Sequence, residues 1–121
     1  MDSREVQEVL RNPQLARLGD AFVNFLFSLA LTQSCGEPVG IKVSDKVLFE
    51  AAKKSAIKSF LPRRMKRGHV ANVVEALIVN SWLKKSLSLE EMTRIVCRNP
   101  GNLSDAAAEL LKDILERMKD R

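Results

Sequence analysis

Apolar residues recur at helical spacing along the whole chain. In the segment 13–34, apolar side chains recur three or four residues from one another: Leu15, Leu18, Phe22, Phe25, Leu26 and Leu29. No segment alternates apolar and polar residues in the way that is typical of a half-buried strand. The pattern predicts an all-α domain of about six helices, over residues 4–10, 13–34, 45–58, 69–85, 88–98 and 105–119.

Capping residues support several of these helix starts. Asn12 is followed directly by a proline, which is favoured at the first position of a helix. Ser88 and Glu91 have the spacing of a capping box, in which each side chain bonds the other residue's backbone N–H. Ser44 and Ser104 are the predicted N-caps of the helices that begin at 45 and 105.

Two of the predicted helices, 13–34 and 69–85, are apolar on nearly all sides. Such a helix lies at the centre of a domain or in a contact between subunits. Both helices nevertheless carry a line of polar residues. The first line consists of Arg17, Asp20, Asn24 and Ser28, and the second of His69, Asn72 and Glu75. Residues three or four apart share one face of a helix, so each line forms a polar seam.

Length and composition predict one domain, over residues 1–121, with a core of its own. The two cysteines, Cys35 and Cys97, form no C-x-x-C pair, and we expect both to be reduced core residues of a cytoplasmic protein. The start of the chain is charged and lacks the apolar core of a signal peptide. The longest uncharged stretch, 21–36, is too short to cross a bilayer, so no membrane contact is expected.

Positive charge is concentrated in one segment. The chain has a net charge of +5, whereas residues 42–67 contain nine Lys or Arg and two acids, a net +7 that leaves −2 for all other residues. A charge run of this kind is often only a solvated helix face. Its density in "LPRRMKRGH" favours phosphate binding to a polyanion, and Arg63, Arg64, Lys66 and Arg67 are the predicted phosphate-binding residues.

The two polar seams also suggest a metal site. If the two central helices pack side by side, Asp20 and Glu75 converge. Two carboxylates, an amide oxygen and several waters suit Mg²⁺, with Mn²⁺ as a substitute, and such an ion can activate water beside a phosphate. His69 is the only histidine, and we interpret it as a polar neighbour or a phosphate contact rather than a catalytic base.

A purely structural interpretation of the same acids is also open. Asp20 would then pair with Arg17 one turn away, and Glu75 with a lysine of the basic segment.

Two stretches of the sequence, one in each central helix, resemble motifs of the ribonuclease III catalytic domain. "LARLGDAFVNFLFSLAL" is similar to the signature helix of that family, and "RGHVANVVEALIVNSWL" is similar to its second motif. The resemblance covers about residues 12–85 and implies the family's all-α fold. It places Asp20 and Glu75 at the positions of the two motifs' metal-coordinating acids.

The sequence departs from the family pattern at several positions. Ala16 stands where the first motif has a glutamate, Pro13 replaces an earlier glutamate, and Arg17 replaces an aromatic residue. Asn72 stands where the second motif has an aspartate. Ala16 and the short length resemble the compact Mini-III branch, which has no separate double-stranded-RNA-binding domain.

Three functions follow as hypotheses. The resemblance implies a homodimeric, Mg²⁺-dependent endoribonuclease acting on double-stranded or structured RNA, in which Asp20 and Glu75 hold the ion and Asn72 orients it or a water. A second hypothesis is a non-catalytic RNA-binding homodimer on the same scaffold. A third is a helical protein-interaction module whose acids are merely paired with bases, and it predicts no salt-dependent affinity for RNA.

Overall fold

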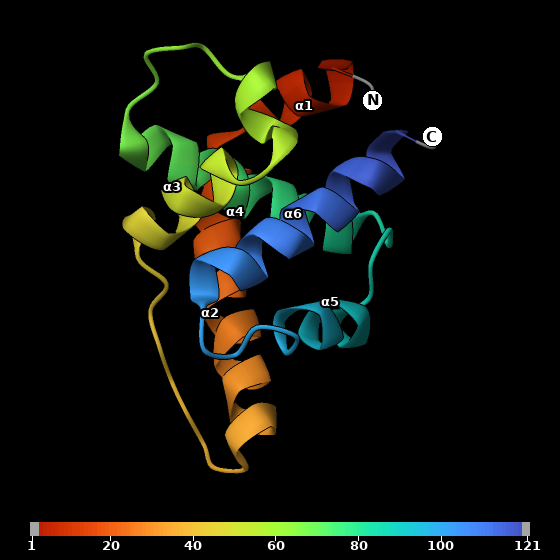
Figure 1. The fold of residues 1–121 in the computed structure, drawn as a ribbon. Helices are drawn as coiled ribbons and strands as arrows, with labels where there is room; N and C mark the ends of the chain where they lie inside the picture. Colours follow the sequence, from red (N-terminus) through yellow and green to blue (C-terminus); the bar gives the residue numbers. More distant parts are fainter. Residues whose placement is uncertain (1–2, 120–121) are drawn as a thin grey trace.

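The computed structural model describes residues 3–119, all of whose regular elements are helical (Figure 1). In chain order they are α1 (Ser3–Leu10), α2 (Pro13–Cys35), α3 (Asp45–Lys53), the 3-10 helix η1 (Ala56–Phe60), α4 (Arg67–Leu83), α5 (Leu89–Val96) and α6 (Leu103–Lys119). The all-α prediction is therefore confirmed. The predicted domain also included residues 1–2 and 120–121, which lie outside the described residues.

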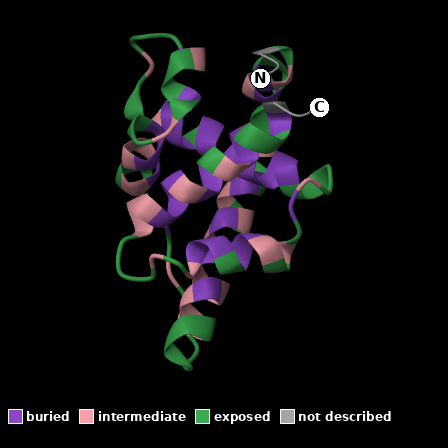
Figure 2. Cartoon of the chain, turned by 45° about the vertical axis from the view of Figure 1, so that its right-hand side comes forward, coloured by how far each residue is buried: buried purple, intermediate pink, exposed green. Residues whose placement is uncertain are grey.

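Helix α4 forms the centre of the fold. Every residue from Val73 to Ser81 is buried, and α1, α2, α3 and α6 all pack against the helix. Figure 2 shows the buried positions continuing from α4 into the facing sides of its neighbours. Of the two positions predicted for an apolar helix, the centre of a domain or a contact between subunits, α4 takes the first.

Helix α2 is buried on one side only. Val23, Leu26 and Phe27 face the core, where the helix packs against α4 and α5. On its other side Leu18 and Phe25 are exposed. By length and composition α2 (Pro13–Cys35) also meets the criterion for a membrane span, since an 18-residue window within it has a mean hydropathy of 1.3. A central helix of a folded domain meets it too, so the absence of membrane contact stays a prediction.

Several predicted helix boundaries differ from the structure by two to five residues, and local hydrogen bonds explain two of these differences. The predicted helix 45–58 ends at Lys53, because the Ser55 side chain accepts a hydrogen bond from the Ile57 N–H and starts the 3-10 helix η1. The last helix begins at Leu103, two residues earlier than predicted. Its first turn is capped by Asn102, whose Oδ1 accepts from the Asp105 N–H at 3.1 Å, in place of the predicted cap Ser104.

An extended segment, residues 37–43, runs back along α2 from its lower end to α3 (Figure 1). Three side chains of α2 accept its backbone N–H groups: Thr32 from Val39 at 2.9 Å, Ser28 from Ile41 at 2.9 Å and Asn24 from Val43 at 2.7 Å. Four helical residues rise about 6 Å, and two extended residues span about 6.6 Å. The two repeats therefore match, and the polar seam of α2 fixes residues 39–43 in place.

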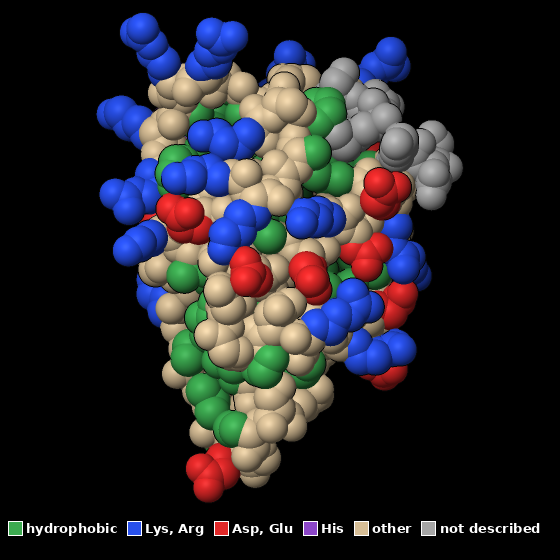
Figure 3. All heavy atoms as spheres, in the orientation of Figure 1, with side chains coloured by type: hydrophobic (Ala, Val, Ile, Leu, Met, Phe, Trp, Pro, Cys, Tyr) green, Lys and Arg blue, Asp and Glu red, His purple; other side chains and the backbone are tan. Residues whose placement is uncertain are grey.

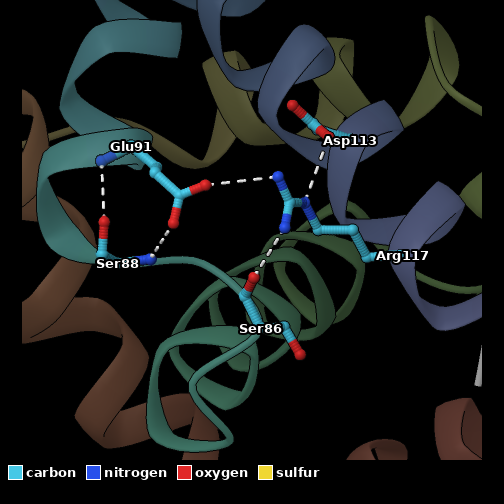
Figure 4. Close-up of polar contacts among 5 residues, drawn as sticks. All are labelled: Ser86, Ser88, Glu91, Asp113 and Arg117. Carbon is cyan, nitrogen blue, oxygen red and sulfur yellow. Dashed lines mark hydrogen bonds and ion pairs between the residues drawn. The ribbon is translucent and has the colours of Figure 1, made fainter.

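Arg117 of α6 joins the C-terminal helices (Figure 4). Its guanidinium donates to the Ser86 carbonyl at 2.9 Å and lies 3.3 Å from Glu91, whose side chain completes the predicted capping box with Ser88. Hydrogen bonds from the Ser88 backbone and hydroxyl lower the pKa of Glu91. These contacts hold the start of α5 against α6, away from the polar seams of α2 and α4.

The cysteine prediction is half right. Both Cys35 and Cys97 are free thiols. Cys97 is partly buried, whereas Cys35 is exposed at the end of α2, where the helix extends beyond its neighbours, and so is not a core residue.

Candidate functional site

A close approach of α2 and α4 brings the two polar seams together. The closest point is at Gly19, where an added Cβ would overlap the Glu75 carbonyl and lie 3.0 Å from the Glu75 Cβ. Only a residue without a side chain fits there. The next residue along α2 is Asp20, so the glycine lets Asp20 reach Glu75 on the facing helix.

Asp20 and Glu75 form a hydrogen-bonded pair of carboxyl groups. Glu75 is only 4% exposed, whereas the Asp20 side chain is 50% exposed. The pKa of Glu75 is raised from 4.5 to about 8, chiefly by burial and then by a hydrogen bond to Asp20 and the negative charge of Asp20. At neutral pH Glu75 therefore holds a proton, which it donates to the Asp20 carboxylate.

Asp20 has two further partners. The Asn24 amide donates to its Oδ1 at 3.2 Å, and the Lys42 Nζ lies 3.8 Å from the same oxygen. The alternative pairing of Asp20 with Arg17 is not formed. Within residues 3–119, Glu75 has no ion pair with a lysine either, although the charge of Lys42 lowers its pKa slightly against the other effects.

The acid pair lies in an open cavity of about 910 Å³. Asn72 and His69, one and two turns before Glu75 on α4, also line it. The predicted catalytic residues Asp20, Asn72 and Glu75 thus line one cavity together with His69, as expected if the two helices pack side by side. Ala16 lines the cavity one turn before Asp20. The position at which the first motif of the family has a glutamate therefore faces the same cavity, but here it carries no acid.

The four basic residues predicted to bind phosphate lie beside this cavity rather than in it. Arg63, Arg64, Lys66 and Arg67 are exposed, whereas Pro62 and Met65 of the same segment line the cavity. Figure 3 shows Lys and Arg side chains gathered over the upper left of the molecule, where Figure 1 places the segment that leads into α4. The basic surface and the acid pair are therefore neighbours.

The donor set fits a hard divalent cation in part. Asp20 and Glu75 supply carboxylate oxygens and Asn72 an amide oxygen, and Mg²⁺ is often bound by only one or two carboxylates and several waters. In the part of the chain that the structure describes, no three His, Cys, Asp or Glu side chains cluster as a complete metal site. An ion bound here would keep much of its water.

Three residues were not predicted from the sequence to belong to the site: Asn24, Lys42 and Asp45. Lys42 and Asp45 line the cavity, and the charge of Asp45 raises the pKa of Glu75. Lys42 and Asp45 come from the segment that leads into α3 and from the first residue of that helix. Only the matching repeats of α2 and the extended segment could have indicated that Lys42 reaches Asp20.

A comparison with protein families agrees with this geometry. The family model described as Ribonuclease III matches residues 13–120, which is nearly the whole chain. No curated protein matches the chain significantly.

Proposed function

Because the chain belongs to the ribonuclease III family, we propose that it is a metal-dependent endoribonuclease that hydrolyses double-stranded or structured RNA. One observation carries the proposal: Asp20 and Glu75 hydrogen-bond each other in an open cavity that Asn72 also lines. Two carboxylates held against each other, one of them buried, are unfavourable without a partner. A bound cation would offset this cost.

Asp20 and Glu75 would hold Mg²⁺, or Mn²⁺ as a substitute, with Asn72 as a neutral oxygen donor. When bound, such an ion polarises a phosphoryl oxygen and makes its water a better nucleophile. Asp20 is half exposed and reaches solvent, whereas Glu75 fixes the depth of the site. Glu75 must release its proton before it can act as a ligand, so we expect metal binding to strengthen as the pH rises through about 8.

The basic residues between 63 and 67 would bind the RNA. Arg63, Arg64, Lys66 and Arg67 are exposed, and none of them has an ion pair within residues 3–119. A-form duplexes are recognised through phosphates, 2′-hydroxyls and shape rather than base edges, which suits a surface without aromatic side chains. His69 lies between this segment and the acid pair, where a phosphate would pass.

We also propose that the protein is a homodimer. Exposed apolar side chains gather on α2 and the end of α4: Leu18, Phe25, Trp82 and Leu83. Phe22 stacks on Trp82 at 5.0 Å between ring centroids and joins the two helices into one apolar surface. Such a patch beside a functional site is typical of a protein interface.

A non-catalytic RNA-binding protein on the same scaffold is the second candidate. Ala16 and Asn72 carry no charge at two positions of the cavity, and Lys42 competes with any cation for Asp20. Both features lower the affinity for Mg²⁺. A helical protein-interaction module is the third candidate, and nothing in the cavity specifically favours it.

One experiment separates the three. Purified protein is mixed with labelled duplex RNA in Mg²⁺, in Mn²⁺ and in chelator, and binding and cleavage are measured with the wild type, Asp20→Asn and Glu75→Gln. Metal-dependent cleavage that both variants lose, with RNA binding retained, supports the nuclease. Binding without cleavage in any metal supports the second candidate, and absence of salt-dependent binding supports the third.

A further inference from the structure

We propose that Arg17 and Lys42 together bind one phosphate group of the RNA in the cavity that Asp20 and Glu75 line. The inference rests on the function proposed above and deepens it by naming the groups that place a phosphate against the acid pair. Both side chains line the cavity that holds Asp20 and Glu75, and neither belongs to the phosphate-binding residues predicted within 63–67.

Arg17 is an exposed cation that pairs with no side chain among the described residues 3–119. It lies on α2 one turn before Asp20, a spacing at which an ion pair would be ordinary. The guanidinium nevertheless makes no hydrogen bond or ion pair with any residue from 3 to 119, because the Asp20 carboxylate is bonded to Asn24 and faces Lys42 instead. An arginine at a cavity wall with all its donors free is suited to an incoming anion.

Lys42 combines a fixed backbone with a free side chain. Its two neighbours, Ile41 and Val43, are hydrogen-bonded through their N–H groups to Ser28 and Asn24 of α2. The Lys42 side chain is 77% exposed, and its ion pair with Asp20 spans 3.8 Å. A solvent-exposed pair at that distance contributes little, so Lys42 can contact a phosphate without losing a strong interaction.

Phosphate is the anion that this arrangement fits best. Two carboxyl groups repel an anion unless cations flank them, and Arg17 and Lys42 provide those cations on two different elements. A guanidinium binds two phosphate oxygens at once, and an ammonium adds a point charge from another direction. Fixed cations aimed at a phosphoryl group also stabilise the charge that develops during hydrolysis.

The test compares Arg17→Ala and Lys42→Ala with two matched controls outside the cavity. These are Arg98→Ala, just after the end of α5, and Lys112→Ala on α6. Binding of a labelled RNA duplex is measured in chelator over a range of salt concentrations, and single-turnover cleavage in Mg²⁺. Each cavity variant should reduce the slope of log K against log salt by about one and slow cleavage about tenfold or more. Arg17→Lys should recover part of both losses.

The outcomes separate this inference from the proposed function. If the wild type cleaves or binds RNA while Arg17→Ala and Lys42→Ala behave like the controls, the phosphate site is overturned and the function stands. If the wild type binds but never cleaves, the nuclease proposal fails, and a reduced slope in the two variants still supports the phosphate site. Faster cleavage by Lys42→Ala at low Mg²⁺ would show that Lys42 only competes with the metal, and no salt-dependent binding by the wild type would overturn both proposals.

Discussion

Gly19 of α2 lies directly against the backbone of Glu75 on α4, so closely that a methyl group at Gly19 would overlap the Glu75 carbonyl. This contact fixes how near the two helices come. It therefore also fixes the distance between their acids, since Asp20 follows Gly19 and Glu75 is the residue that it touches. Gly19 of the first motif is therefore required for the close helix packing that brings Asp20 and Glu75 together.

Gly19→Ala should destabilise the protein. Alanine has a better helix propensity than glycine by about 1 kcal/mol, but the overlap with backbone forces the helices apart and should cost about 3 kcal/mol or more. We expect a clear net loss in the free energy of urea unfolding. Gly40→Ala is the matched control, because nothing lies within 4 Å of its added Cβ. Equal stability of the two variants would contradict the close approach.

Stability should fall as the pH rises through neutrality. The pKa of Glu75 is raised from 4.5 to about 8 on folding, so the folded protein holds this proton more tightly than the unfolded chain. The stabilisation is complete below about pH 4.5 and is lost as the pH passes 8. We expect the free energy of unfolding to decrease by about 2–4 kcal/mol between pH 5.5 and 8.5. Glu75→Gln keeps the shape without the titration, so a similar decrease in that variant would assign the effect to other groups.

Ser28→Ala should loosen the extended segment. The change leaves the Ile41 N–H without its partner in α2, which costs about 1–3 kcal/mol for a buried donor and less where water reaches it. The direct readout is hydrogen exchange, in which the Ile41 amide should exchange much faster than in the wild type. Ser34→Ala removes a hydroxyl from the exposed end of the same helix and should leave that amide protected.

Asn72→Asp should raise the affinity for Mg²⁺. A third carboxyl group in the cavity adds charge where the ion is proposed to bind, and we expect about tenfold tighter binding by calorimetry. The same change should lower stability without metal, because three acids then repel one another. Gln33→Glu adds an equal charge at the far end of α2 and should change neither quantity. Unchanged affinity in Asn72→Asp would place the ion elsewhere.

Phe25→Lys should convert the proposed homodimer to a monomer. Phe25 is 53% exposed and lies within the apolar surface of α2 and α4, so a charge there opposes association without entering the core. Sedimentation analysis measures the mass, and circular dichroism checks that the fold is kept. Gln33→Lys adds the same charge to α2 outside that surface and should stay dimeric. A monomeric wild type would contradict the dimer itself.

The sequence by itself determined the helices and the two polar seams. Helical periodicity and local caps depend on neighbouring residues, so Pro13–Cys35 and the capping box of Ser88 were predictable. Predicted boundaries were wrong where a side chain accepts the backbone N–H two or three residues later, as at Ser55 and Asn102.

Only the tertiary structure decided what surrounds the acids. Asp20 was predictable as an acid on an apolar helix, but its partner could have been Arg17 as readily as Lys42. The choice depends on the extended segment, which α2 holds by hydrogen bonds between residues 13 to 19 positions apart in sequence, and Lys42 belongs to that segment. The shared proton of Asp20 and Glu75 likewise depends on a helix separation that Gly19 permits and that packing of α2 on α4 sets. Long-range contacts of this kind are determined by how whole elements pack, which no local pattern of residues encodes.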